Sequence, residues 1–152
     1  MPNMKWSELS SQQLGRYAEY YAMMEFASYG YEIYSSEVDD HGVDFVAKID
    51  GTFYEVQVKS MFKTTYTFNL KSKMSNTDKT RLVCLLRFVD GVLPEVYVIP
   101  AVAWQRPNAV LVDRNYEGST KSKPEWGIQY SQKNKYLLEP YLSSAFFVKK
   151  LK

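Results

Sequence analysis

The chain of 152 residues contains only one cysteine and one histidine. An internal disulfide is therefore excluded, and Cys84, inside the apolar run RLVCLLRFV, is expected to be a small core side chain rather than a zinc ligand or a nucleophile. No apolar run approaches the roughly 18 residues of a membrane-spanning helix. The N-terminal stretch MPNMKWSELSSQQ lacks the apolar core of a signal peptide. We therefore expect a cytoplasmic protein without membrane association.

The sequence also lacks a glycine-rich loop that could cradle phosphates, which argues against a nucleotide-dependent enzyme. Its formal net charge is only +2, so evidence for a nucleic-acid partner has to come from local clusters of charge. No repeat, low-complexity tract or linker divides the chain. Apolar residues make up 45% and charged residues 24%, as in ordinary globular proteins. We expect a single domain over residues 1–152.

The patterns that are present predict a helix, then several strands, then a second helix. Ser10 and Gln13 form a capping-box pair, apolar residues follow at helical spacing, and Gly30 would end the helix. Near-continuous apolar character predicts that RLVCLLRFV is a strand covered on both faces. Pro140 interrupts the helical periodicity of the C-terminal tail. Further strands are expected at YEIYSSE, TYTFNL, PEVYVIP, AVLVD and WGIQY, with one helical turn at AVAW.

The stretch GVDFVAKIDGTFYEVQVKS, residues 42 to 60, reads as a hairpin that turns at Asp50-Gly51. With these two residues at the centre of the turn, Asp44 lies directly opposite Gln57. Side chains alternate along strands, so Glu55, Gln57 and Lys59 share the face that carries Asp44. The opposite face is expected to join the core through Val43, Phe45, Ala47, Ile49, Tyr54, Val56 and Val58.

The polar face of this hairpin has two interpretations. It could be the solvated side of a half-buried sheet, which is common for strand polar groups. Alternatively, one or two carboxylates on this face, from Asp44 and Glu55, would offer oxygen ligands to Mg²⁺, and Lys59 would stabilise charge that develops on a phosphate or hold the attacking water. Gly42, opposite Lys59, would leave open space beside the amine. These groups together would make a phosphodiester-cleaving site. Glu19 borders the buried stripe of the first helix and could reach whatever that helix packs on.

The order of these motifs resembles the PD-(D/E)XK nuclease superfamily: a helix with Glu19, then GVD with Asp44, then EVQVK ending in Lys59. The variant with glutamine in the third motif is similar to Mrr-like restriction enzymes and some homing endonucleases. LGRYAE also resembles the first-helix motif of these enzymes and of Holliday-junction resolvases. The resemblance covers residues 10 to 60 and extends to core strands at 80 to 100. It implies an α/β, restriction-endonuclease-like fold, a mixed β-sheet flanked by helices, and a metal-dependent endonuclease.

Carried over residue by residue, the resemblance implies Asp44 as the principal metal ligand and Lys59 as the catalytic lysine. Gln57 would ligate through its carbonyl oxygen, and Glu19 directly or through water. Gln57 removes a charge that most of the superfamily has, so Glu55 becomes a candidate auxiliary ligand. The implied cofactor is Mg²⁺, with Mn²⁺ as a substitute, and the implied partner is nucleic acid, DNA in first place. Cutting both strands of a duplex with one small domain usually takes two copies, so a homodimer is a candidate assembly.

A segment rich in basic residues follows the hairpin, from Lys59 to Arg81. It would suit a phosphate backbone, with aromatic side chains to stack on unpaired bases. It would equally suit a solvated edge hairpin whose lysines prevent aggregation. His41, at the mouth of the hairpin, could touch substrate or be an ordinary loop residue. The predicted nucleic-acid contacts are Lys63, Lys71, Lys73, Lys79, Arg81, Tyr66 and Phe68.

Two other functions stay open on the sequence alone. Gln57 would also fit a catalytically degenerate nuclease-fold module that binds nucleic acid or a protein partner. The order of elements alone would fit an α+β binding domain of unknown ligand.

Overall fold

The computed structural model describes residues 1–36 and 42–151, so His41 lies outside the described residues. After a 3₁₀ turn, η1 (Trp6–Glu8), helix α1 runs over Ser11–Ser28. The predicted capping box is confirmed: the Ser10 hydroxyl accepts the Gln13 N–H at 3.1 Å, and the Gln13 side chain accepts the Ser10 N–H at 2.9 Å. Gly30 follows the helix with a φ of +86°, the left-handed conformation that commonly ends helices.

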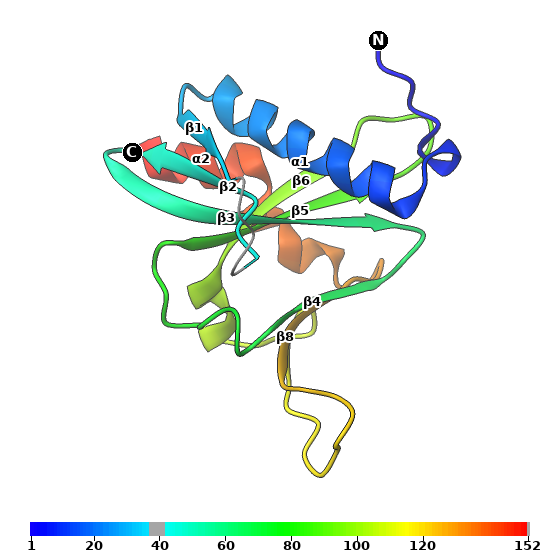
Figure 1. Ribbon diagram of the computed structural model, residues 1–152, viewed down its shortest axis with the longest axis vertical. Helices are drawn as coiled ribbons and strands as arrows, with labels where there is room; N and C mark the ends of the chain where they lie inside the picture. Colours follow the sequence, from blue (N-terminus) through cyan, green and yellow to red (C-terminus); the bar gives the residue numbers. More distant parts are fainter. Residues whose placement is uncertain (37–41, 152) are drawn as a thin grey trace.

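The main sheet has five strands in the order β1-β2-β3-β5-β6 (Figure 1). Strands β3 and β5 are parallel, and the other neighbours are antiparallel. As predicted, β5 is covered on both faces, with only one residue that is not buried. The strands are β1 (Glu32–Ser35), β2 (Phe45–Ile49), β3 (Thr52–Phe62), β5 (Arg81–Phe88) and β6 (Glu95–Pro100).

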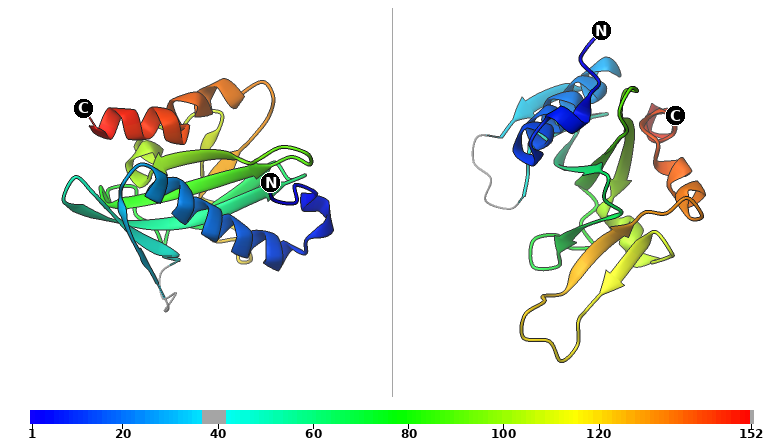
Figure 2. Two further views of the ribbon diagram at one scale, coloured as in Figure 1. Left: turned by 90° about the horizontal axis from the view of Figure 1, so that it is seen from above. Right: turned by 90° about the vertical axis from the view of Figure 1, so that its right-hand side faces the viewer.

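A second sheet has the order β4-β8-β7, from β4 (Tyr66–Leu70), β7 (Leu111–Arg114) and β8 (Glu125–Gln129). These strands match the predicted TYTFNL, AVLVD and WGIQY segments. The connection between β7 and β8 projects from the body of the protein (Figures 1 and 2). The 3₁₀ helix η2 (Ala101–Gln105) occupies the AVAW turn. The tail forms a 3₁₀ helix, η3 (Lys135–Tyr141), which contains Pro140, and then helix α2 (Ser143–Leu151).

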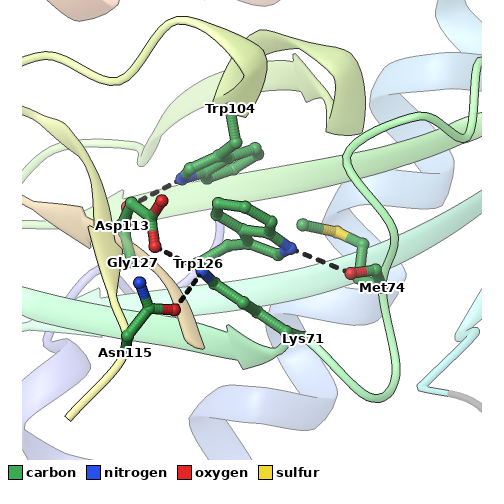
Figure 3. A network of polar contacts seen from close by, with 7 residues as sticks. All are labelled: Lys71, Met74, Trp104, Asp113, Asn115, Trp126 and Gly127. Carbon is green, nitrogen blue, oxygen red and sulfur yellow. Dashed lines mark hydrogen bonds and ion pairs between the residues drawn. The ribbon is translucent and has the colours of Figure 1, made fainter. Parts of the chain in front are cut away.

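Two hydrophobic clusters lie on the two faces of the main sheet. On one face, Phe26 of α1 packs edge-to-face on Phe45 and on Phe147 of α2, with ring centroids 5.1 and 4.9 Å apart. On the other face, Trp104 and Trp126 belong to a cluster that joins β3, β5 and β6 to the second sheet. Figure 3 shows how both indoles are fixed by backbone acceptors. Within the described residues, no helix combines the length and the apolar character that crossing a bilayer requires.

Candidate functional site

The β2–β3 hairpin has the predicted turn and register. Asp50 and Gly51 have φ values of +51° and +82°, as a two-residue hairpin turn of the favoured hand requires. Ile49 pairs with Thr52, and the pairing continues to Phe45 opposite Val56. The predicted core face is also confirmed, except that Val58 is only partly buried. Its buried members are Val43, Phe45, Ala47, Ile49, Tyr54 and Val56.

Asp44 lies just before β2 and is held against the edge of β3. Its backbone N–H donates to the Val56 carbonyl at 2.8 Å, and its Oδ2 accepts the Val58 N–H at 2.7 Å. Because β2 begins only at Phe45, the carboxylate takes the place that a backbone acceptor would otherwise fill. This main-chain bond fixes the Asp44 carboxylate at the level of Gln57, which lies between Val56 and Val58 on β3.

Gly42 lies against the Gln57 amide. A Cβ at Gly42 would be 2.8 Å from Nε2 and 3.1 Å from Cδ of Gln57, and Gly42 has a φ of +74°. The prediction that Gly42 opens space beside Lys59 was therefore wrong. The regular pairing stops at Phe45, and the left-handed residue bends the chain toward Gln57 instead. Only a glycine combines this conformation with so close an approach.

Glu55, Gln57 and Lys59 occupy alternate positions along β3 and point to one face, each about 6.6 Å from the next along the strand. Gln57 and Lys59 are half-buried and Glu55 is exposed. On the other side of β3, Gln57 pairs with Val83 and Lys59 with Leu85 of the buried strand β5. Gln57 and Lys59 therefore lie on an interior strand. Asp44 bonds to the edge of β3 at the point where β2 has not yet begun.

Glu19 lies on α1, over the opposite face of the main sheet. Its Oε2 is 3.3 Å from Nη1 of Arg16, and its side chain is 31% exposed. Tyr17 contacts Phe88 of β5, and Glu19 lies about 160° from Tyr17 around the helix axis. Glu19 lies about 20° from Phe26 around the same axis, and Phe26 packs on Phe45, the residue that follows Asp44. Glu19 therefore occupies the flank of α1 on the side of β2 rather than β5. Within residues 1–36 and 42–151, no three Asp, Glu, His or Cys side chains gather as a metal site, so Glu19, Asp44 and Glu55 form no three-carboxylate cluster.

The oxygen donors of Asp44 and Gln57, at the same level of the hairpin, suit an ion that retains water. Asp44 supplies a carboxylate held in place by the Val58 N–H, and Gln57 supplies the carbonyl oxygen of an amide that packs on Gly42. Mg²⁺ is typically held by one or two carboxylates together with substrate phosphates and water, rather than by a complete protein cage. The chemistry of this donor pair therefore fits Mg²⁺ and does not fit a structural zinc site, which needs four nitrogen or sulfur ligands.

The predicted basic contacts divide into exposed and internal residues. Lys63, Lys73 and Lys79 are exposed. The Lys71 Nζ bonds to the Asp113 carboxylate, lies 2.6 Å from Oδ1 of Asn115 and sits 4.0 Å from the centroid of a Trp126 ring (Figure 3). Arg81 is only 6% exposed. Lys71 is therefore half-buried and held by partners at the end of β7, and Arg81 is buried, which leaves the three exposed lysines as the most accessible cations of this set.

The two predicted aromatic contacts also differ. Tyr66 lies across Gly127, donates its hydroxyl to the Glu125 carboxylate, and has the Arg114 guanidinium 4.1 Å above its ring. Burial, and then the hydrogen bond to Glu125, raise the pKa of the Tyr66 hydroxyl. Phe68 stacks beside Tyr66 with a centroid distance of 6.1 Å and is 42% exposed. Of the pair, Phe68 has the ring that a ligand can reach.

Tyr34, Lys48 and Phe53 also lie on the sheet face of Asp44, although no motif in the sequence marks them as functional. Phe53 pairs with Lys48, and Tyr34 pairs with Val46. Side-chain alternation along β2 and β3, followed as far as the hairpin turn, would have placed Lys48 and Phe53 on this face. The sequence could not predict that Tyr34 lies on this face, because the pairing of β1 with β2 has no local sequence signature.

The fold is shared with two nucleases of known structure, while no family model and no curated protein matches the sequence. A bacterial homing endonuclease, I-Ssp6803I, superposes with a TM-score of 0.53 and 17% identity over 91% of each chain. Hjc, a Holliday junction resolvase from Archaeoglobus fulgidus, superposes with a TM-score of 0.54 and 10% identity over 89% of this chain and 95% of its own. At such identities the likeness concerns the fold. The chain therefore has the restriction-endonuclease-like fold of the PD-(D/E)XK nucleases, as its motifs predicted.

Proposed function

We propose that this protein is a Mg²⁺-dependent endonuclease that hydrolyses phosphodiester bonds in DNA, with Mn²⁺ as an alternative ion. One observation carries the proposal. The Asp44 carboxylate is fixed by the Val58 N–H at 2.7 Å at the level of Gln57, with Lys59 next along the same face of β3. This arrangement occurs in a fold shared with a homing endonuclease and a Holliday junction resolvase.

Each side chain has a definite part in this proposal. Asp44 and the Gln57 carbonyl would hold the ion, with Glu19 as a ligand through water and Glu55 as an auxiliary carboxylate. When bound, Mg²⁺ would polarise a phosphate oxygen and lower the pKa of a bound water. The Lys59 ammonium has three donors, so it can orient the attacking water and stabilise the negative charge that grows on the phosphate. The exposed Lys63, Lys73 and Lys79 would contact the DNA backbone.

A second candidate function has one observation in its favour. The site has a neutral amide at Gln57, and the described residues contain no three-carboxylate metal cluster. A nuclease-fold module that has lost metal affinity and binds nucleic acid or a protein partner would show the same features. The two candidates share the fold and differ in whether the chain cuts DNA.

The test is cleavage of single-stranded, duplex and branched DNA in the presence of Mg²⁺ or Mn²⁺. Asp44→Asn and Lys59→Ala should each lower cleavage by at least about 10²-fold, the scale for the loss of one preorganised electrostatic group. Asp50→Asn and Lys133→Ala make the same charge changes in the hairpin turn and at an exposed position, and should leave the rate unchanged. Gln57→Glu should tighten Mg²⁺ binding measured by calorimetry, because it adds a charged oxygen ligand.

The outcomes separate the two candidates. Activity that requires both Asp44 and Lys59 would establish a nuclease. A wild-type protein inert on every DNA, whose Gln57→Glu variant gains metal binding, would contradict the nuclease proposal and favour the degenerate module.

A further inference from the structure

The sheet face that carries Asp44 and Gln57 continues into two uncovered aromatic rings. Phe53 is 55% exposed and Tyr34 is 46% exposed. Lys48 pairs with Phe53 on β3 and with Glu32 on β1. Side-chain alternation then places all four of these residues on the face of Asp44. We call this set, Glu32, Tyr34, Lys48 and Phe53, the β1–β3 platform.

The rings of the β1–β3 platform are held in place before any ligand arrives. The Tyr34 hydroxyl donates to Oε2 of Glu32 at 2.6 Å. The Tyr34 and Phe53 rings lie 6.0 Å apart at 51°, and the Lys48 Nζ is 5.5 Å from the centroid of Phe53. Large apolar rings left exposed in contact with one another indicate an interaction surface. Rings already fixed lose little conformational freedom when a ligand stacks on them.

The strand register sets the separation between the platform and the proposed site. Phe53 precedes Gln57 by four positions on β3, which corresponds to about 13 Å at about 3.3 Å per residue. One strand of DNA covers that distance in about four stacked nucleotides at about 3.4 Å each. A strand whose phosphate lies at Asp44 and Gln57 would therefore present its bases to Phe53 within a few nucleotides.

The charges on this face favour contact with the bases of a DNA strand over contact with its phosphates. Glu32 and the exposed Glu55 would repel phosphates, whereas carboxylates accept hydrogen bonds from the amino groups of bases. Lys48 and Lys59 lie toward the two ends of the face, where their positive charges would attract flanking phosphates. Only unpaired bases can turn a π-face onto a protein ring. The combination of acids, rings and terminal lysines therefore fits a single strand with its bases toward the sheet.

We propose that the β1–β3 platform stacks unpaired bases within about four nucleotides of the scissile phosphate, at about 3.4 Å per nucleotide. DNA with a single-stranded stretch, such as a flap, a fork or a branched junction, is then the substrate class. The inference rests on the proposed function for the position of the scissile phosphate. The binding it predicts is independent of cleavage.

The experiment measures binding of wild type and variants to a fluorescent single-stranded DNA and to its fully paired duplex, without divalent ions, so that no cleavage occurs. Phe53→Leu and Tyr34→Leu should each weaken single-strand binding by about 5- to 150-fold, the range for loss of one stacked base, and leave duplex binding unchanged. Phe53→Trp restores a ring and should retain wild-type affinity. Tyr136→Leu removes a tyrosine that is 64% exposed on η3 and serves as the control. With 2-aminopurine placed along the strand, wild type should quench its fluorescence and Phe53→Leu should not.

Three results would overturn the inference. The first is single-strand binding by Phe53→Leu within twofold of wild type. The second is an equal loss of duplex and single-strand binding. The third is a wild-type dimer that Phe53→Leu converts to a monomer in analytical ultracentrifugation, which would make this face a contact between two copies of the chain. Phe53-dependent single-strand binding by a protein that cuts no DNA would support the inference and contradict only the proposed function. DNA cleavage by a protein whose single-strand binding is unchanged by Phe53→Leu would support the proposed function and contradict the inference.

Discussion

Replacing Gly42 with alanine tests whether the close approach of this residue to Gln57 shapes the site. Two separate costs are expected. The φ of +74° places an alanine in the left-handed region, which costs about 1–2 kcal/mol. The new Cβ would also lie 2.8 Å from Nε2 and 3.1 Å from Cδ of Gln57. Since the amide ends a flexible side chain, it would rotate off its preferred geometry at a cost of about 0.5–1.5 kcal/mol.

The hairpin supplies a matched control for the first cost alone. Gly51 has a φ of +82°, and a Cβ there would meet nothing within 4 Å. Gly51→Ala should therefore lower the free energy of unfolding by the backbone term of about 1–2 kcal/mol, and Gly42→Ala by about 1 kcal/mol more. Combining Gly42→Ala with Gln57→Ala should remove this additional loss of stability, because the Gln57 amide that the new Cβ would contact is then absent.

Urea unfolding gives the stabilities, and DNA cleavage with Mg²⁺ gives the functional effect. Gly42→Ala displaces the Gln57 amide from its place beside Asp44, so cleavage should fall by about 10²-fold, while Gly51→Ala should cut at the wild-type rate. Equal stabilities and equal cleavage rates for Gly42→Ala and Gly51→Ala would refute the reasoning.

Three further predictions concern other parts of the molecule. Lys71→Ala should lower the free energy of unfolding by about 1–2 kcal/mol through loss of its ion pair and indole contact, whereas Lys73→Ala should leave stability unchanged and reduce the salt dependence of DNA binding by about one phosphate contact. Burial disfavours the Glu95 carboxylate, but hydrogen bonds from Lys135 and a neighbouring arginine outweigh it and lower its pKa below 4.5. The ionised Glu95 carboxylate therefore stabilises the folded state fully at pH values above 4.5, and this stabilisation is lost as pH falls through the folded-state pKa. In urea unfolding, the free energy of unfolding of Glu95→Gln should therefore fall less on acidification than that of wild type. Burial raises the pKa of the Cys84 thiol, so an aromatic disulfide reagent should modify it only in denaturant, and rapid modification of the native protein would contradict its place in the core.

The local features of the fold followed from the sequence because their causes are short-range. The Ser10–Gln13 capping box, the Asp50-Gly51 turn and the period-two pattern of residues 42 to 60 each involve residues close together in the chain. Once the turn was identified, alternation placed Asp44, Gln57 and Lys59 on one face. The motif order then matched the restriction-endonuclease-like fold that the two solved nucleases share with this chain.

Only the tertiary structure decided the contacts between distant segments. Pairing of β4 with β8, rather than with a neighbour in sequence, builds the second sheet, and it brings Lys71 to Asp113 and Asn115. The basic pattern around Lys71 is the same whether its amine contacts a phosphate or the side chains of Asp113 and Asn115. The left-handed bend at Gly42, which places the residue on Gln57 rather than beside Lys59, likewise occurs where the regular pairing has ended. Side-chain periodicity reports which face of an element is buried, but it contains no information on which distant element covers that face.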